Sequence, residues 1–153
     1  MRDDRPTIAI LGGTGALGSG LARRWAQAGY RLIIGSRQQQ RAAAAAISLC
    51  DAISTKDVRG MANAAAEAAD IVVMTVPFAH HASTIRSVRD AVQGKIFVDT
   101  TVPLVPPKSG TVQLPPGGSA AAAALTSILI SINRHHQIDG AGIKITGAPK
   151  SDQ

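Results

Sequence analysis

The feature that most constrains this chain of 153 residues is an apolar run, residues 8–11, that breaks into glycines and then becomes helical. The spacing Gly13-x-Gly15-x-x-Gly18 fits the dinucleotide fingerprint, whose glycines permit a tight turn, the approach of a pyrophosphate to the backbone and the packing of helix on strand. A helical pattern follows, closed by Gly29, and then a second apolar run at 30–34. We therefore predict a strand, a helix and a second strand, with a phosphate at the start of the helix.

The remainder of the chain continues the alternation of strands and helices. Residues 70–77 form a near-continuous β-branched run, which is typical of a central parallel strand buried on both faces, and 94–99 form another strand. We place helices at 41–47, 60–69, 82–92 and 120–130, the last with Ser119 as N-cap, and a short strand near 52–54. The predicted fold is α/β, a Rossmann-type doubly wound parallel sheet in a single domain.

The domain boundary is expected at residue 130. Residues 1–130 form the nucleotide-binding domain, and 131–153 form a tail in which 143–145 are expected as a last short strand. The segment 104–118 is rich in proline and glycine, which predicts a long loop over the edge of the sheet where ligands bind.

The turn after the second strand predicts which dinucleotide binds. Proteins that bind NAD place Asp or Glu there, where it accepts hydrogen bonds from the ribose hydroxyls, and such a carboxylate would repel a 2′-phosphate. This chain has Ser36, Arg37 and, one helical turn later, Arg41. A hydroxyl can donate one hydrogen bond to a phosphate group, and a guanidinium group can donate two parallel hydrogen bonds to it. We therefore predict NADP(H) rather than NAD(H).

Further candidates follow the two later strands, because ligands of an open α/β sheet lie beyond the carboxyl ends of its strands. We therefore place Thr75, Val76, Pro77, Phe78 and His80 beside the bound dinucleotide, and Val102 at the same edge. Imidazole is a common proton shuttle, but we favour a role at the helix start or in cofactor packing for His80, and we expect His81 to face solvent. No catalytic residue is assigned, and no metal-ligand cluster is recognised.

Composition excludes several other classes of protein. The net charge is +6, but the basic residues are spread along the chain and aromatic residues make up only 3%, which does not fit a nucleic-acid-binding protein. Cys50 is the single cysteine and cannot form an internal disulfide. No apolar run approaches the roughly 20 residues of a membrane helix, and no signal peptide is recognised at the start. We therefore expect a cytoplasmic protein without membrane partners.

With these motifs identified, the chain resembles the NADPH-dependent reductases of the deazaflavin coenzyme F-420, also called F-420:NADP oxidoreductases. The similarity rests on residues 10–22, 35–37, 70–78 with His80, 102–103 and 118–121. It implies hydride transfer between NADP(H) and coenzyme F-420 as co-substrate. Carried over by position, it implies that Thr14 to Leu17 bind the pyrophosphate and that Val76, His80 and Val102 line the path to the nicotinamide. The candidate cofactor-binding residues are Gly13, Thr14, Gly15, Ala16, Leu17, Gly18, Ser36, Arg37, Arg41, Val76, His80 and Val102.

Two alternatives to this function stay open. The first keeps NADP but changes the acceptor to a small imine, a keto acid or a hydroxy acid. The second is a non-catalytic NADP(H)-binding protein, because members of the family continue beyond the length of this chain with elements that complete the deazaflavin pocket and a dimer interface. A homodimer is one assembly that the resemblance allows.

Overall fold

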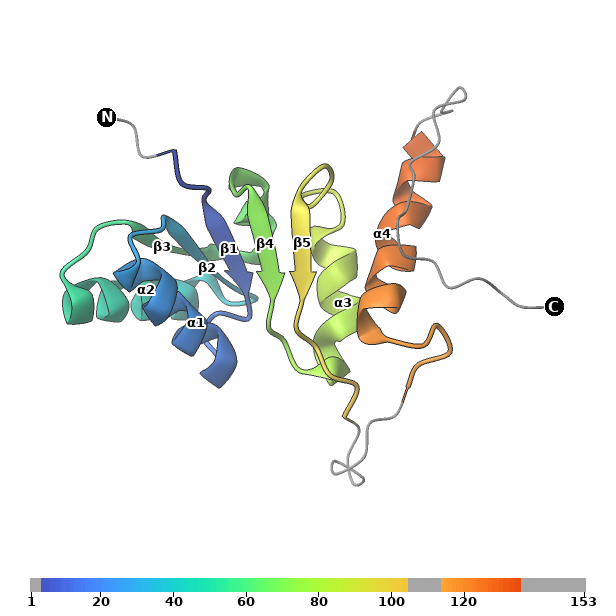
Figure 1. The fold of residues 1–153 in the computed structure, drawn as a ribbon, viewed down its shortest axis with the longest axis horizontal. Helices are drawn as coiled ribbons and strands as arrows, with labels where there is room; N and C mark the ends of the chain where they lie inside the picture. Colours follow the sequence, from blue (N-terminus) through green and yellow to red (C-terminus); the bar gives the residue numbers. More distant parts are fainter. Residues whose placement is uncertain (1–3, 105–113, 136–153) are drawn as a thin grey trace.

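The computed structural model describes residues 4–104 and 114–135. Its five strands form one parallel sheet in the order β3-β2-β1-β4-β5. Helices α1 and α2 lie toward one end of this order and α3 and α4 toward the other (Figure 1). In chain order the elements are β1 (Ile8–Leu11), α1 (Ala16–Gln27), β2 (Leu32–Ser36), α2 (Gln39–Ile53), β3 (Val58–Ala62), the 3₁₀ helix η1 (Asn63–Ala68), β4 (Ile71–Met74), α3 (Phe78–Val88), β5 (Ile96–Asp99) and α4 (Ala120–His135).

Two apolar clusters, one on each face, hold the sheet between its helices. Successive side chains of a strand point to opposite faces, so Ile8 and Ile10 of β1 pack with α1 and α2, whereas Ala9 and Leu11 pack with η1, α3 and α4. All four are buried, as expected for a central strand of a parallel sheet covered on both faces. The structure confirms the predicted Rossmann-type fold.

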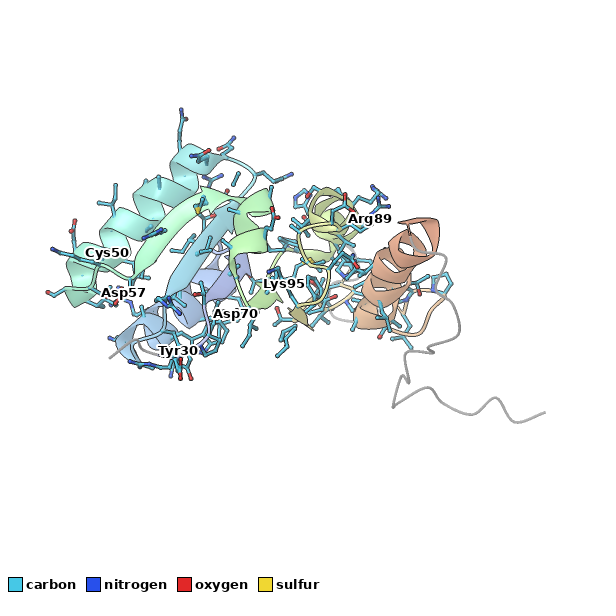
Figure 2. All side chains as sticks on the ribbon, turned by 90° about the horizontal axis from the view of Figure 1, so that it is seen from above. Tyr30, Cys50, Asp57, Asp70, Arg89 and Lys95 are labelled. Atoms are coloured by element: carbon cyan, nitrogen blue, oxygen red, sulfur yellow. The ribbon has the colours of Figure 1, made fainter. Side chains whose placement is uncertain are left out.

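The edge at which the strands begin is held by hydrogen bonds between side chains and backbone. The Asp70 carboxylate accepts the N–H of Thr7 at 2.8 Å. The Lys95 ammonium donates to the carbonyls of Glu67 and Ala69 at 2.7 and 2.6 Å and so connects β5 to the end of η1. Figure 2 looks onto this edge from above and labels Asp70 and Lys95. These bonds fix the sheet at the edge opposite to the carboxyl ends of the strands.

Two predicted elements between the second and fourth strands are wrong. The residues expected as a strand, 52–54, include the end of α2 and its C-cap, and β3 occupies 58–62, where we expected the start of a helix. Pairing decides the structure here, because β3 runs in register with β2 from Leu32 opposite Val58 to Ser36 opposite Ala62. Gly60 also permits close packing, since a side chain there would overlap the Ala42 carbonyl of α2.

Other boundaries differ less from the prediction. Helix α3 begins at Phe78, earlier than the expected residue 82, and ends at Val88. The Ser119 hydroxyl accepts the N–H of Ala122 at 3.0 Å, which confirms Ser119 as the N-cap of α4. The strand expected at 143–145 lies outside the described residues. Within the described ranges, none of the helices has the length and apolar character needed to cross a membrane.

Candidate functional site

A pocket of about 560 Å³ opens at the carboxyl ends of β1, β2 and β4. This is the edge at which ligands bind in open α/β sheets. Its walls come from three turns and from the starts of η1 and α3. The residues that line it are Gly12, Thr14, Gly15, Ser36, Arg37, Gln38, Arg41, Asn63, Thr75, Val76, Pro77, His80 and Thr84.

The turn from β1 into α1 forms one wall of the pocket. Gly12 has φ +78°, in the left-handed region, and a Cβ there would lie 2.8 Å from Val76 Cγ1. A Cβ on Gly18 would lie 2.7 Å from the Gly12 carbonyl oxygen and from Thr75 Oγ1. Because both positions lack a side chain, α1 packs directly against the turn and its amino end reaches the pocket.

Four backbone N–H groups are available at this end of α1. Among the described residues, the amides of Thr14, Ala16, Leu17 and Gly18 have no backbone acceptor. The amides of Gly13 and Gly15 are already bonded, Gly13 to Ile10 and Gly35 and Gly15 to Gly12. Free amides at the positive end of a helix dipole form a binding site for an anion.

The turn after β2 supplies the basic wall. Ser36 ends the strand, Arg37 follows it, and Arg41 lies in the first turn of α2, where the Ser36 hydroxyl accepts the N–H of Gln38 at 3.2 Å. Neither guanidinium is in an ion pair within the described residues. Among residues 4–104 and 114–135, no carboxylate lines the pocket. The structure therefore brings together the three residues that the sequence predicts for a phosphate.

The third wall is the turn from β4 into α3. The Thr75 hydroxyl donates to the Leu11 carbonyl at 2.9 Å, which joins the end of β4 to the end of β1. Val76 and the half-buried His80 line the pocket. In the described part of the chain, no side chain is hydrogen-bonded to the His80 imidazole. A partner that would hold this imidazole as a general base is thus not found there.

The expectation for the neighbouring histidine is wrong. The His81 side chain is only 5% exposed, and its Nε2 lies 2.7 Å from Asp99 Oδ2, which is 3% exposed. The other oxygen of Asp99 accepts the N–H of Thr101 at 2.9 Å. His81 is buried because this pairing joins α3 to the end of β5. Sequence reasoning missed it, since its two residues are 18 positions apart.

The remaining predicted residues lie beside the pocket rather than in its lining. Gly13 and Ala16 line a second pocket of about 330 Å³ on the α1 and α2 side. Leu17 is half-exposed on α1, Gly18 is buried under the turn, and Val102 is exposed after β5.

Thr75 and Pro77, which the sequence places beside the ligand at this edge, also line the pocket. Sequence reasoning missed four lining residues, Gly12, Gln38, Asn63 and Thr84. Gly12 adjoins the fingerprint and Gln38 adjoins a predicted site, so the neighbourhood of the motifs was a usable signal for these two. For Asn63 and Thr84 the sequence carries no local signal.

Comparison with known proteins identifies the family of this chain. The model of one protein family, described as NADP oxidoreductase coenzyme F-420-dependent, matches residues 7–103. The chain belongs to this family. The match includes every strand of the sheet and every residue that lines the larger pocket.

Curated relatives of the chain carry a matching name. It is 45% identical over 100 residues to the F-420-dependent NADP reductase of Methanothermobacter marburgensis, a match that covers 63% of this chain and 45% of the relative. It is 38% identical over 122 residues to the enzyme of the same name from Methanocaldococcus jannaschii, with 74% of this chain and 54% of the relative covered. The chain thus spans about half the length of these relatives.

Solved structures support the fold alone. The lactate dehydrogenase of Eimeria maxima, solved with NADH and oxamate, matches with a TM-score of 0.60 at 18% identity, over 84% of this chain and 42% of that one.

Proposed function

We propose that this chain binds NADP(H) in the larger pocket and transfers a hydride between NADP(H) and the deazaflavin coenzyme F-420. One observation carries the proposal. Thr14, one of the residues with a free amide at the helix start, lines the same pocket as Arg37 and Arg41, and among the described residues neither arginine is in an ion pair and no carboxylate lines the pocket. Pyrophosphate and 2′-phosphate are the two anionic groups of NADP(H). The helix start is suited to bind the pyrophosphate, and the basic turn is suited to bind the 2′-phosphate. The family membership and the names of the relatives support coenzyme F-420 as the second substrate.

In this proposal, different residues bind different parts of the nucleotide. The amides of Thr14, Ala16 and Leu17, with the Gly13, Gly15 and Gly18 backbone that shapes the turn, bind the pyrophosphate. Ser36, Arg37 and Arg41 bind the 2′-phosphate. Val76 and His80 contact the nicotinamide half, and Val102, which follows β5 at the same edge, lies farther along its path.

The nicotinamide of bound NADP(H) supplies the hydride chemistry, and the protein contributes alignment and the exclusion of water. The Thr75 hydrogen bond to β1 fixes the wall that Val76 presents to the pocket. No proton transfer by a side chain is assigned, which agrees with the His80 imidazole having no hydrogen-bonded side chain in the described part.

A spectroscopic assay tests this function. Purified protein is mixed with NADPH and oxidised F-420, and the absorbance of the deazaflavin is followed. We expect the absorbance to fall with NADPH and to change far more slowly with NADH. Binding of NADPH without any oxidation by F-420 would contradict hydride transfer.

A second candidate is an NADP(H)-binding protein without turnover. It is favoured by one observation: the residues that line the pocket include candidate groups for the phosphates, and among the described residues no side chain is hydrogen-bonded to the His80 imidazole. NADPH binding with no oxidation by F-420, a small imine or a keto acid would select this candidate.

We also propose the division of the chain into a domain of residues 1–130 and a tail of residues 131–153, the cytoplasm as compartment and a homodimer as assembly. The single cysteine supports a reducing compartment. The resemblance to F-420 reductases supports the dimer, and sedimentation equilibrium tests it, with twice the mass of the chain as the expected result.

A further inference from the structure

Asn63 is a buried polar residue in the pocket that the roles given above do not use. It is the first residue of η1, directly after β3, and its side chain lines the pocket while the residue is only 7% exposed. Its Oδ1 is buried and has no hydrogen-bond partner among the described residues. A buried acceptor without a donor costs free energy, so a donor supplied by a ligand would relieve this cost.

The position of Asn63 relates it to one part of the proposed nucleotide. A Cβ on Gly35 would lie 2.9 Å from Asn63 Oδ1, so the carboxamide packs against the residue that precedes Ser36. Ser36 begins the proposed 2′-phosphate site. The 2′-phosphate and the adenine base are attached to adjacent carbons of one ribose. A ligand held at Ser36 and Arg37 must therefore place its base within the width of a sugar from that site.

A second buried polar residue lies in the same pocket. Three polar or charged residues are buried as whole residues within the described ranges, and two of them, Asn63 and Thr84, line the pocket. They come from η1 and α3, which pack against each other. The walls assigned to the two phosphates and to the nicotinamide come from the turns after β1, β2 and β4, so the side formed by the start of η1 is left for the base.

The chemistry of a carboxamide matches adenine. Asparagine offers one acceptor and an NH₂ donor side by side, and adenine presents its 6-amino donor beside the ring acceptor N7. The Cβ–Cγ torsion of asparagine is broad, so the carboxamide can turn its oxygen toward the base. Hypoxanthine carries a carbonyl oxygen in place of the 6-amino group and would oppose Asn63 Oδ1 with a second acceptor.

We propose that Asn63 recognises the adenine base of the bound dinucleotide through its carboxamide and so determines the base specificity of the site. This inference rests on the proposed binding of NADP(H).

The test compares NADPH with its reduced hypoxanthine analogue, in which an oxo group replaces the 6-amino group and N1 carries a proton, while N7 is unchanged. Each is titrated by calorimetry into the unaltered protein and into Asn63→Ala. We expect the unaltered protein to bind NADPH about 10-fold or more tightly than the analogue, as for other bidentate pairs of asparagine with adenine. In Asn63→Ala the ratio of the two dissociation constants should approach one. The control Ser36→Ala should weaken both ligands by a similar factor and keep the ratio.

The outcomes distinguish a failure of this inference from a failure of the proposed NADP(H) binding. Equal affinities for the two ligands in the unaltered protein overturn the role of Asn63 while leaving NADPH binding intact, and this comparison needs no variant to fold. An unchanged ratio in Asn63→Ala also overturns it and makes Asn63 a packing residue. Failure of the unaltered protein to bind either ligand overturns the proposed function and this inference together.

Discussion

Arg37 faces the pocket from a turn without acidic residues, and its charge is the single-residue feature on which the choice of cofactor depends. We predict that Arg37→Asp weakens NADPH by about 10- to 100-fold, because charge-assisted hydrogen bonds contribute about 1.5–3 kcal/mol each. The affinity for NADH, which lacks the 2′-phosphate, should fall much less. Titration of both nucleotides measures the difference.

The matched control for this variant is Arg59→Asp. Arg59 is exposed on β3 and outside the pocket lining, and the substitution changes the net charge equally. It should leave the ratio of the two affinities unchanged. An equal loss of NADPH and NADH in Arg37→Asp would show that Arg37 does not contact the 2′-phosphate.

Two glycines of α1 provide a paired test of the turn. In Gly18→Ala the new Cβ would lie 2.7 Å from backbone atoms of Gly12 and Gly13, so the helix must move away from the turn. We predict a loss of about 1–3 kcal/mol of stability, as for other overpacked sites, together with weaker NADPH binding. Urea unfolding and titration measure the two effects.

Gly20→Ala is the control, because a Cβ there meets nothing within 4 Å. It should raise stability by about 0.5–1 kcal/mol through better helix propensity. If Gly18→Ala behaved in the same way as Gly20→Ala, the close contact between α1 and the turn would be wrong.

At the scale of elements, the His81 and Asp99 pair joins α3 to the end of β5 and so supports one wall of the pocket. Both side chains are nearly inaccessible, and Thr101, bonded to Asp99, also donates its hydroxyl to the Val76 carbonyl at 3.4 Å. We predict that His81→Leu costs about 3–5 kcal/mol, since it leaves a carboxylate buried without its partner. Urea unfolding measures this loss.

A double-mutant cycle distinguishes the pairing from simple packing. Because His81→Leu/Asp99→Leu removes both polar groups, its destabilisation should be clearly smaller than the sum of the two single losses. Additive losses would show that the two side chains do not interact.

The elements also show where prediction from sequence succeeds. The central strands carry continuous or nearly continuous apolar runs, so β1, β2 and β4 could be placed from the sequence to within a few residues. The edge strand β3 could not. It exposes Arg59 and Met61, lies within an alanine-rich region and is fixed by pairing with β2, none of which is visible locally.

For the whole molecule, the sequence predicts the fold and groups the candidate residues by strand end, because a parallel sheet brings those ends to one edge. It predicts a phosphate site at Ser36, Arg37 and Arg41. This prediction depends on the absence of Asp or Glu after the second strand as much as on the charge of the two arginines. It could not predict the burial of Asn63 or His81, since each depends on elements distant in the chain that cover it.

The central claim is that this pocket selects the phosphorylated dinucleotide. Its most direct test is calorimetric titration of the unaltered protein with NADPH and with NADH at the same ionic strength. We predict that NADPH binds at least about 10-fold more tightly, since two arginines and a serine line the wall of the pocket at which we propose that the 2′-phosphate binds. Equal dissociation constants for the two nucleotides, or binding of neither, would contradict it.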